Sequence, residues 1–259
     1  MSELCDIRGV SVLYRGQPIP ALKEIEFSIA AGERLAIIGE SGSGKSTLAR
    51  VLAGLLPPGT KVSGEICWPG GRPLPGRDLG FVFQDPSSSL NPVLTVGEQV
   101  AEGARRHLGL SWKQAEARAR EMLEKVRMPQ PEKTLKAFPH QLSGGQRQRV
   151  AIAAALAAKP GILIADEATS ALDMVVQADI VSLLDDLVRD ARMTLIFVTH
   201  DIALASGFAD RVAIFRDGRL VETGSTTAVL ASPGETYTKT LLASHRDLTT
   251  RPLIEDAVG

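Results

Sequence analysis

The 259-residue chain lacks several features that would by themselves assign it to a class. It has only two cysteines, Cys5 and Cys67, and they show neither metal-ligand spacing nor a disulfide framework. It has no excess of charge of one sign, because 29 lysines and arginines are balanced by 30 aspartates and glutamates. We therefore expect no field strong enough to attract nucleic acid or an anionic membrane. The cysteine usage fits a reduced, cytosolic setting.

Long hydrophobic runs are also missing. The longest covers residues 150–158 and is rich in alanine, which is far short of the roughly 20 residues that a membrane-spanning helix needs. The first six residues contain no basic segment followed by an apolar one, so we expect no signal peptide. Any membrane role must then come through a partner protein.

The chain does contain an alternation of strand-like and helical segments. Before residue 85 the short apolar runs are typical of strands, and they lie at residues 7–12, 22–29, 35–38, 62–68 and 80–83. Residues 85–92 read as a loop, and helical periodicity then dominates to about residue 158. This change of texture predicts a helical subdomain, at about residues 85–160, inserted into an α/β core.

Strand-like texture returns after residue 160. The apolar runs 162–165 and 195–198 are typical of central parallel strands, and a helical pattern at 175–190 lies between them. Residues 211–222 are expected to form a β-hairpin with its turn at Asp217-Gly218. A short helical piece is expected at residues 237–242.

The most specific pattern is a glycine-rich loop between an apolar strand and a helical segment, the context of a phosphate-binding P-loop. Glycines let successive backbone N–H groups point into one concavity, and the helix that follows adds its dipole. Lys45 is expected to reach the β- and γ-phosphates and Ser46 to hold Mg²⁺. The predicted nucleotide-binding residues are Gly39, Glu40, Ser41, Gly42, Ser43, Gly44, Lys45, Ser46 and Thr47.

An acidic pair, Asp166 and Glu167, ends the apolar run 162–165. Ligands of α/β sheets bind at the carboxyl ends of the strands. We therefore expect Asp166 to support Mg²⁺, directly or through water, and Glu167 to act as the general base on the attacking water. Two solvated acids at a strand end are the plain structural alternative.

A second glycine-rich helix start lies at residues 142–146, Leu-Ser-Gly-Gly-Gln. Ser143 and Gln146 have the spacing of a capping box, which alone would explain a stable helix start. The two glycines cost about 1 kcal/mol each relative to alanine, and they expose N–H groups at a positive helix end. One nucleotide needs only one P-loop. This second anion site therefore indicates that the chain closes on a nucleotide other than the one bound by its own P-loop.

This motif, placed between the P-loop and the Asp-Glu strand, resembles the signature of ABC transporter ATPases, and the resemblance spans about residues 7–230. It implies a P-loop NTPase core of the ABC type with a mixed sheet, an N-terminal antiparallel β-subdomain and an inserted helical subdomain. A single domain at residues 4–232 and a short tail at 233–259 would follow. It also implies ATP and Mg²⁺ as cofactors.

The resemblance assigns roles to further residues. Tyr14 matches the aromatic residue that stacks on adenine, with a structural strand-end tyrosine as the alternative. Gln84 matches the glutamine that senses Mg²⁺ and the membrane partner, and Asp173, in segment 170–173, matches an aspartate that couples two sites. His200 matches the histidine that contacts the γ-phosphate. The implied catalytic residues are Lys45, Glu167 and His200, and the implied metal residues are Ser46, Gln84 and Asp166.

In this family two cassettes assemble head to tail, which implies that the signature residues serve the ATP of a partner subunit. These residues are Leu142, Ser143, Gly144, Gly145, Gln146 and Asp173. The expected partner is a second ABC ATPase, as a heterodimer with a paralogue or as a homodimer. The pair would lie at the cytoplasmic face of the plasma membrane, below two permeases that a substrate-binding protein feeds. Ala168 stands where the family commonly has proline, and we still expect activity.

Two segments resemble the peptide/nickel importer subfamily: residues 84–92 and the tail at residues 232–242. In the tail, four residues match the subfamily's sequence, namely Tyr237, Thr238, Leu241 and Leu242. The His-Pro pair that the subfamily usually has there is missing. No cysteine follows Cys67, so the cysteine cluster of longer peptide-importer ATPases is absent. We therefore expect an importer for nickel, with a dipeptide or oligopeptide importer as the alternative. The alternatives of another class are a non-transport ABC ATPase acting on ribosomes or DNA, which commonly carries two fused cassettes, a coiled-coil insertion or basic extensions, and a partner subunit with little turnover. Such a subunit usually lacks Glu167, His200 or a signature glycine, and all of these are present in this chain.

Overall fold

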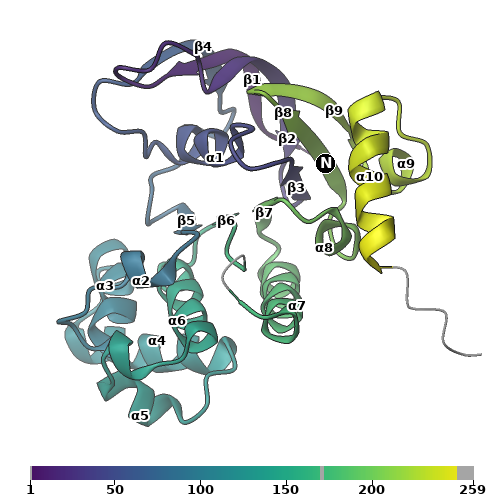
Figure 1. Cartoon of the computed structure of the whole chain (residues 1–259). Coiled ribbons are helices and arrows are strands. Elements are labelled where there is room, and N and C mark those ends of the chain that lie inside the picture. The colour runs from purple at the N-terminus through teal and green to yellow at the C-terminus, as the bar shows by residue number, and fades with distance from the viewer. Residues whose placement is uncertain (1, 170–171, 250–259) are drawn as a thin grey trace, which may run out of the picture.

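The computed structural model describes residues 2–169 and 172–249, and Figure 1 shows a core of sheets and helices above a separate group of helices. The larger sheet has the strand order β5-β6-β7-β3-β8-β9. All neighbours pair in parallel except β8 and β9, which form the expected antiparallel hairpin. Its strands are β3 (Arg34–Ile38), β5 (Leu79–Val82), β6 (Ile162–Asp166), β7 (Thr194–Thr199), β8 (Arg211–Arg216) and β9 (Arg219–Ser225).

A smaller antiparallel sheet has the order β2-β1-β4, with strands β1 (Glu3–Leu13), β2 (Leu22–Ala30) and β4 (Lys61–Cys67). The pairing of β1 with β4 shifts register between Arg8 and Ser11. Opposite this irregularity, a Cβ atom on Gly64 would lie 2.4 Å from the carbonyl oxygen of Gly9, so only glycine fits there. The mixed sheet and the antiparallel N-terminal sheet predicted from the sequence are confirmed.

Helices cover both faces of the larger sheet. On one face α1 (Lys45–Ala53) packs in a cluster with Ile37, Ile164 and Val198. On the other face α7 (Met174–Ala191) packs against Leu195 and Phe197. The remaining core helices are α8 (Ile202–Ser206), α9 (Thr226–Ala231) and α10 (Thr236–Thr249). The helical piece expected at residues 237–242 is part of α10, and the predicted tail beyond residue 249 lies outside the described residues.

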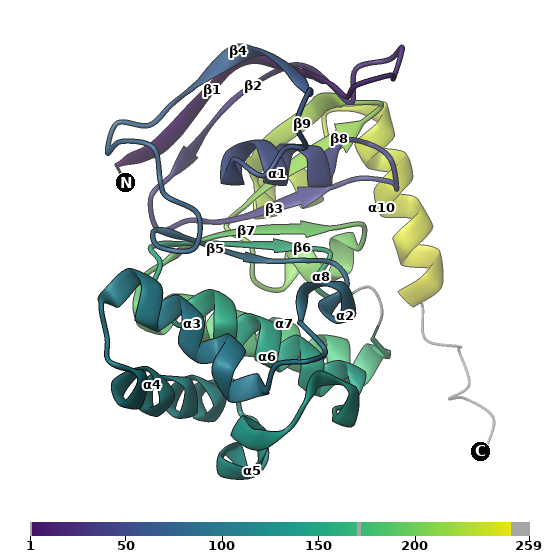
Figure 2. The same ribbon diagram turned by 90° about the vertical axis from the view of Figure 1, so that its left-hand side faces the viewer.

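The helical group between β5 and β6 is the inserted subdomain expected from the sequence (Figure 2). It contains α2 (Pro86–Ser89), α3 (Val96–Leu108), α4 (Trp112–Lys125), α5 (Pro131–Lys136), a 3₁₀ turn (Pro139–Gln141) and α6 (Gly144–Leu156). Capping boxes start α3 at Thr95 and α4 at Ser111, and each such cap contributes about 1 kcal/mol. Within residues 2–169 and 172–249, no helix combines the length and the apolar character that crossing a bilayer requires.

Candidate functional site

The glycine-rich loop joins the end of β3 to the start of α1, and two of its glycines are required by close packing. A Cβ atom on Gly39 would lie 2.2 Å from the carbonyl oxygen of Phe215. A Cβ atom on Gly44, whose φ is +100°, would lie 2.6 Å from the carbonyl oxygen of Ala21. The loop is thus pressed between the end of β8 and the segment before β2, and a side chain at either glycine would displace it.

Lys45 is the first residue of α1, and only 3% of it is exposed. Its Nζ atom donates hydrogen bonds to the carbonyl oxygens of Gly39 and Glu40, both at 2.8 Å, and lies 3.6 Å from Glu167 Oε1. Burial lowers the pKa of Lys45, and the Glu167 carboxylate opposes this shift. The loop therefore curls around its own ammonium group, which is the group that the sequence predicts to meet phosphate.

Ser46 and Asp166 come together across the sheet edge. The Ser46 hydroxyl donates to Asp166 Oδ1 at 2.7 Å, and only 2% of Asp166 is exposed. Burial raises the pKa of Asp166, while the hydrogen bond from Ser46 acts in the opposite direction. Hydroxyl and carboxylate oxygens of this kind are the ligands that Mg²⁺ prefers. In the described part of the chain, no group of three or more His, Cys, Asp or Glu side chains could hold a metal ion.

Gln84 and Glu167 follow neighbouring strands, β5 and β6, and their side chains meet. Gln84 Nε2 donates to Glu167 Oε2 at 2.9 Å. Glu167 itself has a φ of +45°, a left-handed conformation that is uncommon outside glycine, and its N–H donates to the carbonyl oxygen of Val198 on β7. Backbone strain of this kind is found at functional sites, where it fixes the orientation of a side chain. The Glu167 carboxylate is thereby directed between Gln84 and Lys45.

The structure places two further candidates at the same edge. The Tyr14 hydroxyl lies 3.1 Å from Thr47 Oγ1, so the aromatic ring reaches the first turn of α1. His200 directly follows β7 and is exposed. Stacking on adenine by Tyr14 and contact with a γ-phosphate by His200 stay predictions.

The signature residues lie apart from the P-loop, at the start of α6 in the helical subdomain (Figure 1). The predicted capping box is present, because the N–H of Gln146 donates to Ser143 Oγ and the N–H of Ser143 donates to Gln146 Oε1. A Cβ atom on Gly145 would lie 2.8 Å from Val176 Cγ1 on α7. This glycine is therefore required for packing as well as for an open helix end, a reason that the sequence did not reveal.

Asp173 is the N-cap of α7, where its Oδ1 accepts a hydrogen bond from the N–H of Val176 at 3.0 Å. This local role accounts for an aspartate at that position. The coupling of two sites by Asp173 stays a prediction, and residues 170 and 171 of the same segment lie outside the described residues.

The hairpin of β8 and β9 supports the P-loop, a contact that was not predicted from the sequence. The N–H of Gly218 in the turn donates to the carbonyl oxygen of Ser43 at 3.1 Å. The turn itself was predicted from Asp217-Gly218, but the loop that it touches is far away in the chain. No local pattern could have shown that the two are neighbours.

Comparison with known proteins gives consistent matches. The family model described as ABC transporter matches residues 22–170. The oligopeptide transport ATP-binding protein OppD of Bacillus subtilis (strain 168) is 42% identical over 258 residues, which cover 94% of this chain and 72% of OppD. The glutathione import ATP-binding protein GsiA of Escherichia coli (strain K12) is 42% identical over 253 residues, 91% of this chain and 41% of GsiA. The peptidoglycan transport ATP-binding protein YejF of Agrobacterium fabrum is 42% identical over 255 residues, 93% of this chain and 47% of YejF.

Two solved structures share the fold. One is the dimeric structure of an ATP-binding cassette in a post-hydrolysis state bound to ADP and Pi, with 33% identity and a TM-score of 0.75 over 86% of this chain and 98% of that chain. The other is cbiO1 from Clostridium perfringens, part of the ABC transporter complex cbiONQ, with 28% identity and a TM-score of 0.75 over 96% of both chains.

The matches also bear on the expected cargo. The relatives above are named for oligopeptide, glutathione and peptidoglycan transport. The expectation of nickel is therefore not supported, and the peptide alternative is favoured over it. The chain spans less than half the length of GsiA and YejF.

Proposed function

The chain belongs to the ABC transporter family of ATPases, and we propose that it powers the import of peptides or peptide-derived molecules. ATP binding and hydrolysis follow from the family. The proposal for the cargo rests on one observation, the 42% identity with an oligopeptide transport ATP-binding protein over 94% of this chain. The cargo itself does not touch the ATP site, so nothing in the site geometry selects it.

The ATP site is proposed to consist of the residues at the carboxyl edge of the larger sheet. The loop 39–47 would hold the phosphates, with Lys45 on the β- and γ-phosphates and Tyr14 against the adenine. Ser46 and Asp166, with Gln84 beside them, would hold Mg²⁺, which supplies positive charge to the phosphate oxygens when bound. The observed Ser46–Asp166 hydrogen bond supports this, because it brings a hydroxyl and a buried carboxylate to one point.

Glu167 is proposed as the general base. It would accept a proton from water while the water oxygen attacks the γ-phosphorus, and the bond from that phosphorus to the β-phosphate oxygen breaks. Its carboxylate is held by Gln84 and lies near Lys45, so it is oriented at the point where the phosphate-binding and metal-binding residues meet. His200, at the end of the adjacent strand β7, would contact the γ-phosphate.

A second ATPase subunit is proposed to complete the site. The signature residues Leu142–Gln146 and Asp173 would contact the ATP bound by the partner, since they lie in and beside the helical subdomain while the P-loop lies in the core. The dimeric neighbour with ADP and Pi supports this arrangement. The partner would be a paralogue or a second copy of this chain, and the pair would attach to two membrane permeases at the cytoplasmic face, with a substrate-binding protein supplying cargo.

The test is transport by the reconstituted complex. The chain is co-purified with its permeases and partner ATPase, placed in vesicles, and supplied with ATP, the loaded binding protein and either a labelled oligopeptide or ⁶³Ni²⁺. Peptide uptake that is lost in Lys45→Ala supports the proposal. Nickel uptake without peptide uptake would overturn the cargo assignment, and uptake that survives Lys45→Ala would overturn the ATP site.

A further inference from the structure

The C-terminal helix α10 packs on the part of the sheet that carries the P-loop. Leu241 belongs to a buried cluster with Ile38 of β3 and Ile214 of β8, and Tyr237 and Leu242 pack against it. Ile38 is the residue directly before the P-loop. Figure 2 shows α10 beside the end of the sheet at which β3 leads into α1. The tail is thus part of the wall around this loop.

The start of α10 is fixed by a carboxylate on the hairpin. Glu222 of β9 accepts hydrogen bonds from the N–H groups of Gly234 and Glu235, at 2.8 and 3.2 Å. Thr238, in the first turn of α10, is fully buried beside this carboxylate. These contacts set the rotation of the helix about its axis, and they place Tyr237 on the side that faces the P-loop.

Tyr237 touches both the P-loop and the strand that supports it. The guanidinium group of Arg216, at the end of β8, lies 4.8 Å from the centre of the tyrosine ring, within the range of a cation–π contact. The hydroxyl is buried and makes no hydrogen bond of ordinary geometry to the described residues. It lies next to Glu40: burial raises the pKa of Tyr237, the backbone of Glu40 opposes this, and the Glu40 carboxylate adds to it.

Both contacts lead to atoms that shape the phosphate site. The carbonyl oxygen of Glu40 accepts the hydrogen bond from Lys45 Nζ. Arg216 precedes the turn whose Gly218 N–H binds Ser43, and the carbonyl oxygen of its neighbour Phe215 packs on Gly39. The ring therefore lies against the loop at Glu40 and against the strand end that supports Gly39 and Ser43.

The geometry points to Tyr237 as a positioning residue for the P-loop, which holds Glu40 and the end of β8 in the arrangement that binds nucleotide phosphates. This inference rests on the proposed ATP site and is independent of the cargo. The competing explanation for Tyr237 is that it only anchors α10 to the core. An anchor would affect the stability of the chain but not its affinity for nucleotide.

The experiment measures two quantities on the purified full chain, the Kd for a fluorescent ATP analogue with Mg²⁺ and the Tm without nucleotide. Tyr237→Ala should raise the Kd about tenfold, the effect of losing a cation–π contact and the support at Glu40. Tyr237→Phe keeps the ring and its contact with Arg216 and removes a hydroxyl without a hydrogen bond, so it should change the Kd by less than about twofold. Thr240→Ala is the matched control, because Thr240 is exposed on the same helix and bonds only to a helix carbonyl; it should change neither quantity.

Three outcomes decide between the two roles of Tyr237. A Kd that rises in Tyr237→Ala, rises less in Tyr237→Phe and rises about threefold in Arg216→Ala supports the positioning role. A lower Tm with the parental Kd in both Tyr237 variants overturns it and leaves an anchor. If Tyr237→Ala does not fold, Arg216→Ala decides, because a parental Kd in that variant overturns the positioning role. Lys45→Ala separates the two proposals, because a parental Kd in that variant would show that the ATP site itself is wrong.

Discussion

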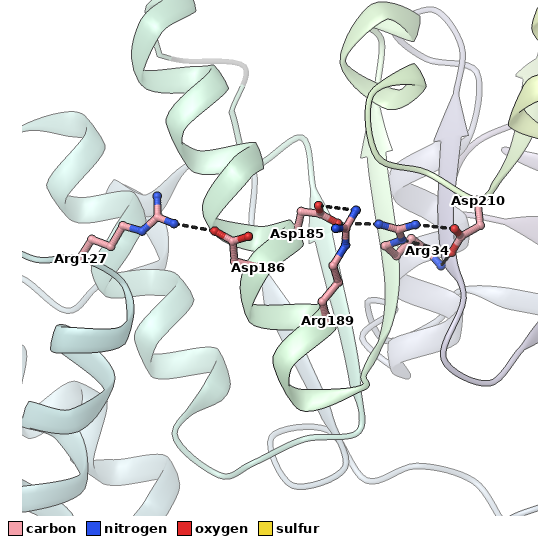
Figure 3. Close-up of polar contacts among 6 residues, drawn as sticks. All are labelled: Arg34, Arg127, Asp185, Asp186, Arg189 and Asp210. Atoms are coloured by element: carbon pink, nitrogen blue, oxygen red, sulfur yellow. Dashed lines mark hydrogen bonds and ion pairs between the residues drawn. The ribbon is translucent and has the colours of Figure 1, made fainter.

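Two neighbouring residues of α7 show how differently the core and the helical subdomain are held (Figure 3). Asp185 accepts a hydrogen bond from Arg34 of β3 at 2.7 Å, and both side chains are mostly buried, at 17% and 19% exposure. Asp186 pairs with Arg127, which follows α4, and both of these side chains are about half exposed, at 54% and 52%. The same helix thus carries a partly buried charge pair toward the core and a solvated one toward the subdomain.

The network on the core side is also larger. Arg34 binds Asp210 through its backbone N–H and its guanidinium group, and Arg189 pairs with Asp185. The guanidinium group donates hydrogen bonds to Asp210 and to Asp185, and these bonds raise the pKa of Arg34 even though burial opposes this. Charged hydrogen bonds of this kind define geometry. On the subdomain side, α7 meets α6 through an apolar side chain, where a Cβ atom on Gly145 would lie 2.8 Å from Val176 Cγ1, and the surface ion pair contributes little.

The largest effect is expected in the core, from Glu167→Gln. The amide keeps the shape of the side chain but accepts no proton from water, so hydrolysis by the assembled complex should fall by about a thousandfold, with ATP binding retained. Phosphate release and nucleotide binding are measured in parallel. Normal turnover would show that another group is the base.

A change in the helical subdomain, Ser143→Arg, should separate binding from hydrolysis. The lone chain should bind ATP with unchanged affinity, because the P-loop is in the core. Hydrolysis by the assembled complex should fall by about a hundredfold, since the bulky side chain blocks the N–H groups offered to the partner's phosphate. Weakened binding by the lone chain would contradict the separation of the two regions.

Arg34→Ala tests the core side of the α7 comparison. It leaves the mostly buried Asp185 and the 40%-exposed Asp210 without their shared partner, which should cost about 2 kcal/mol of unfolding free energy. Urea denaturation measures the change. Arg189→Ala is the control, because Arg189 is 62% exposed and pairs with Asp185 from one turn along the same helix, while Asp185 keeps its hydrogen bond from Arg34; its loss should cost about 0.3 kcal/mol.

Asp166→Asn should make the nucleotide-free chain more stable while impairing hydrolysis. Burial raises the pKa of Asp166, so the folded state favours the protonated acid. The contribution of Asp166 to the free energy of unfolding is therefore fully present below its pKa in the unfolded chain. This contribution is lost as the pH rises through its pKa in the folded chain. Removing the charge should add about 1 kcal/mol at pH 7 and flatten the pH dependence of stability above the unfolded pKa of 3.8. An equal or lower stability at pH 7 would contradict this.

Arg127→Ala, on the subdomain side, should have the smallest effect. An exposed pair of this kind is worth about 0.5 kcal/mol or less, and high salt should remove even that. Asp186→Ala and the double variant complete a cycle, in which the coupling energy should be within about 0.5 kcal/mol of zero. A cost equal to that of Arg34→Ala would show that the two sides of α7 are held alike.

The features that were predicted correctly depend on short stretches of chain. The capping box at Ser143 and the turn at Asp217-Gly218 are where the spacing placed them, because a cap or a turn involves only a few consecutive residues. The peptide/nickel resemblance of the tail marked Tyr237 and Thr238 but gave them no role. Their neighbours, Glu40 and Glu222, are brought to them by the fold.

The order of the strands accounts for what could not be predicted. Gln84 meets Glu167 because β5 lies beside β6, and Glu167 is held by Val198 because β6 lies beside β7. In both cases the partner is distant in the chain. Strand order follows from the burial of the whole sheet rather than from any local pattern.

By itself the sequence determined that a phosphate loop, an acidic strand end and a second glycine-rich helix start exist, since each depends on backbone freedom and residue chemistry within a short stretch of chain. Only the tertiary structure decided which groups face them: Asp166 on Ser46, Gln84 and Lys45 around Glu167, and Tyr237 beside Glu40. The physical reason is that side chains distant in the chain meet only after the sheet and its covering helices have buried their apolar faces together.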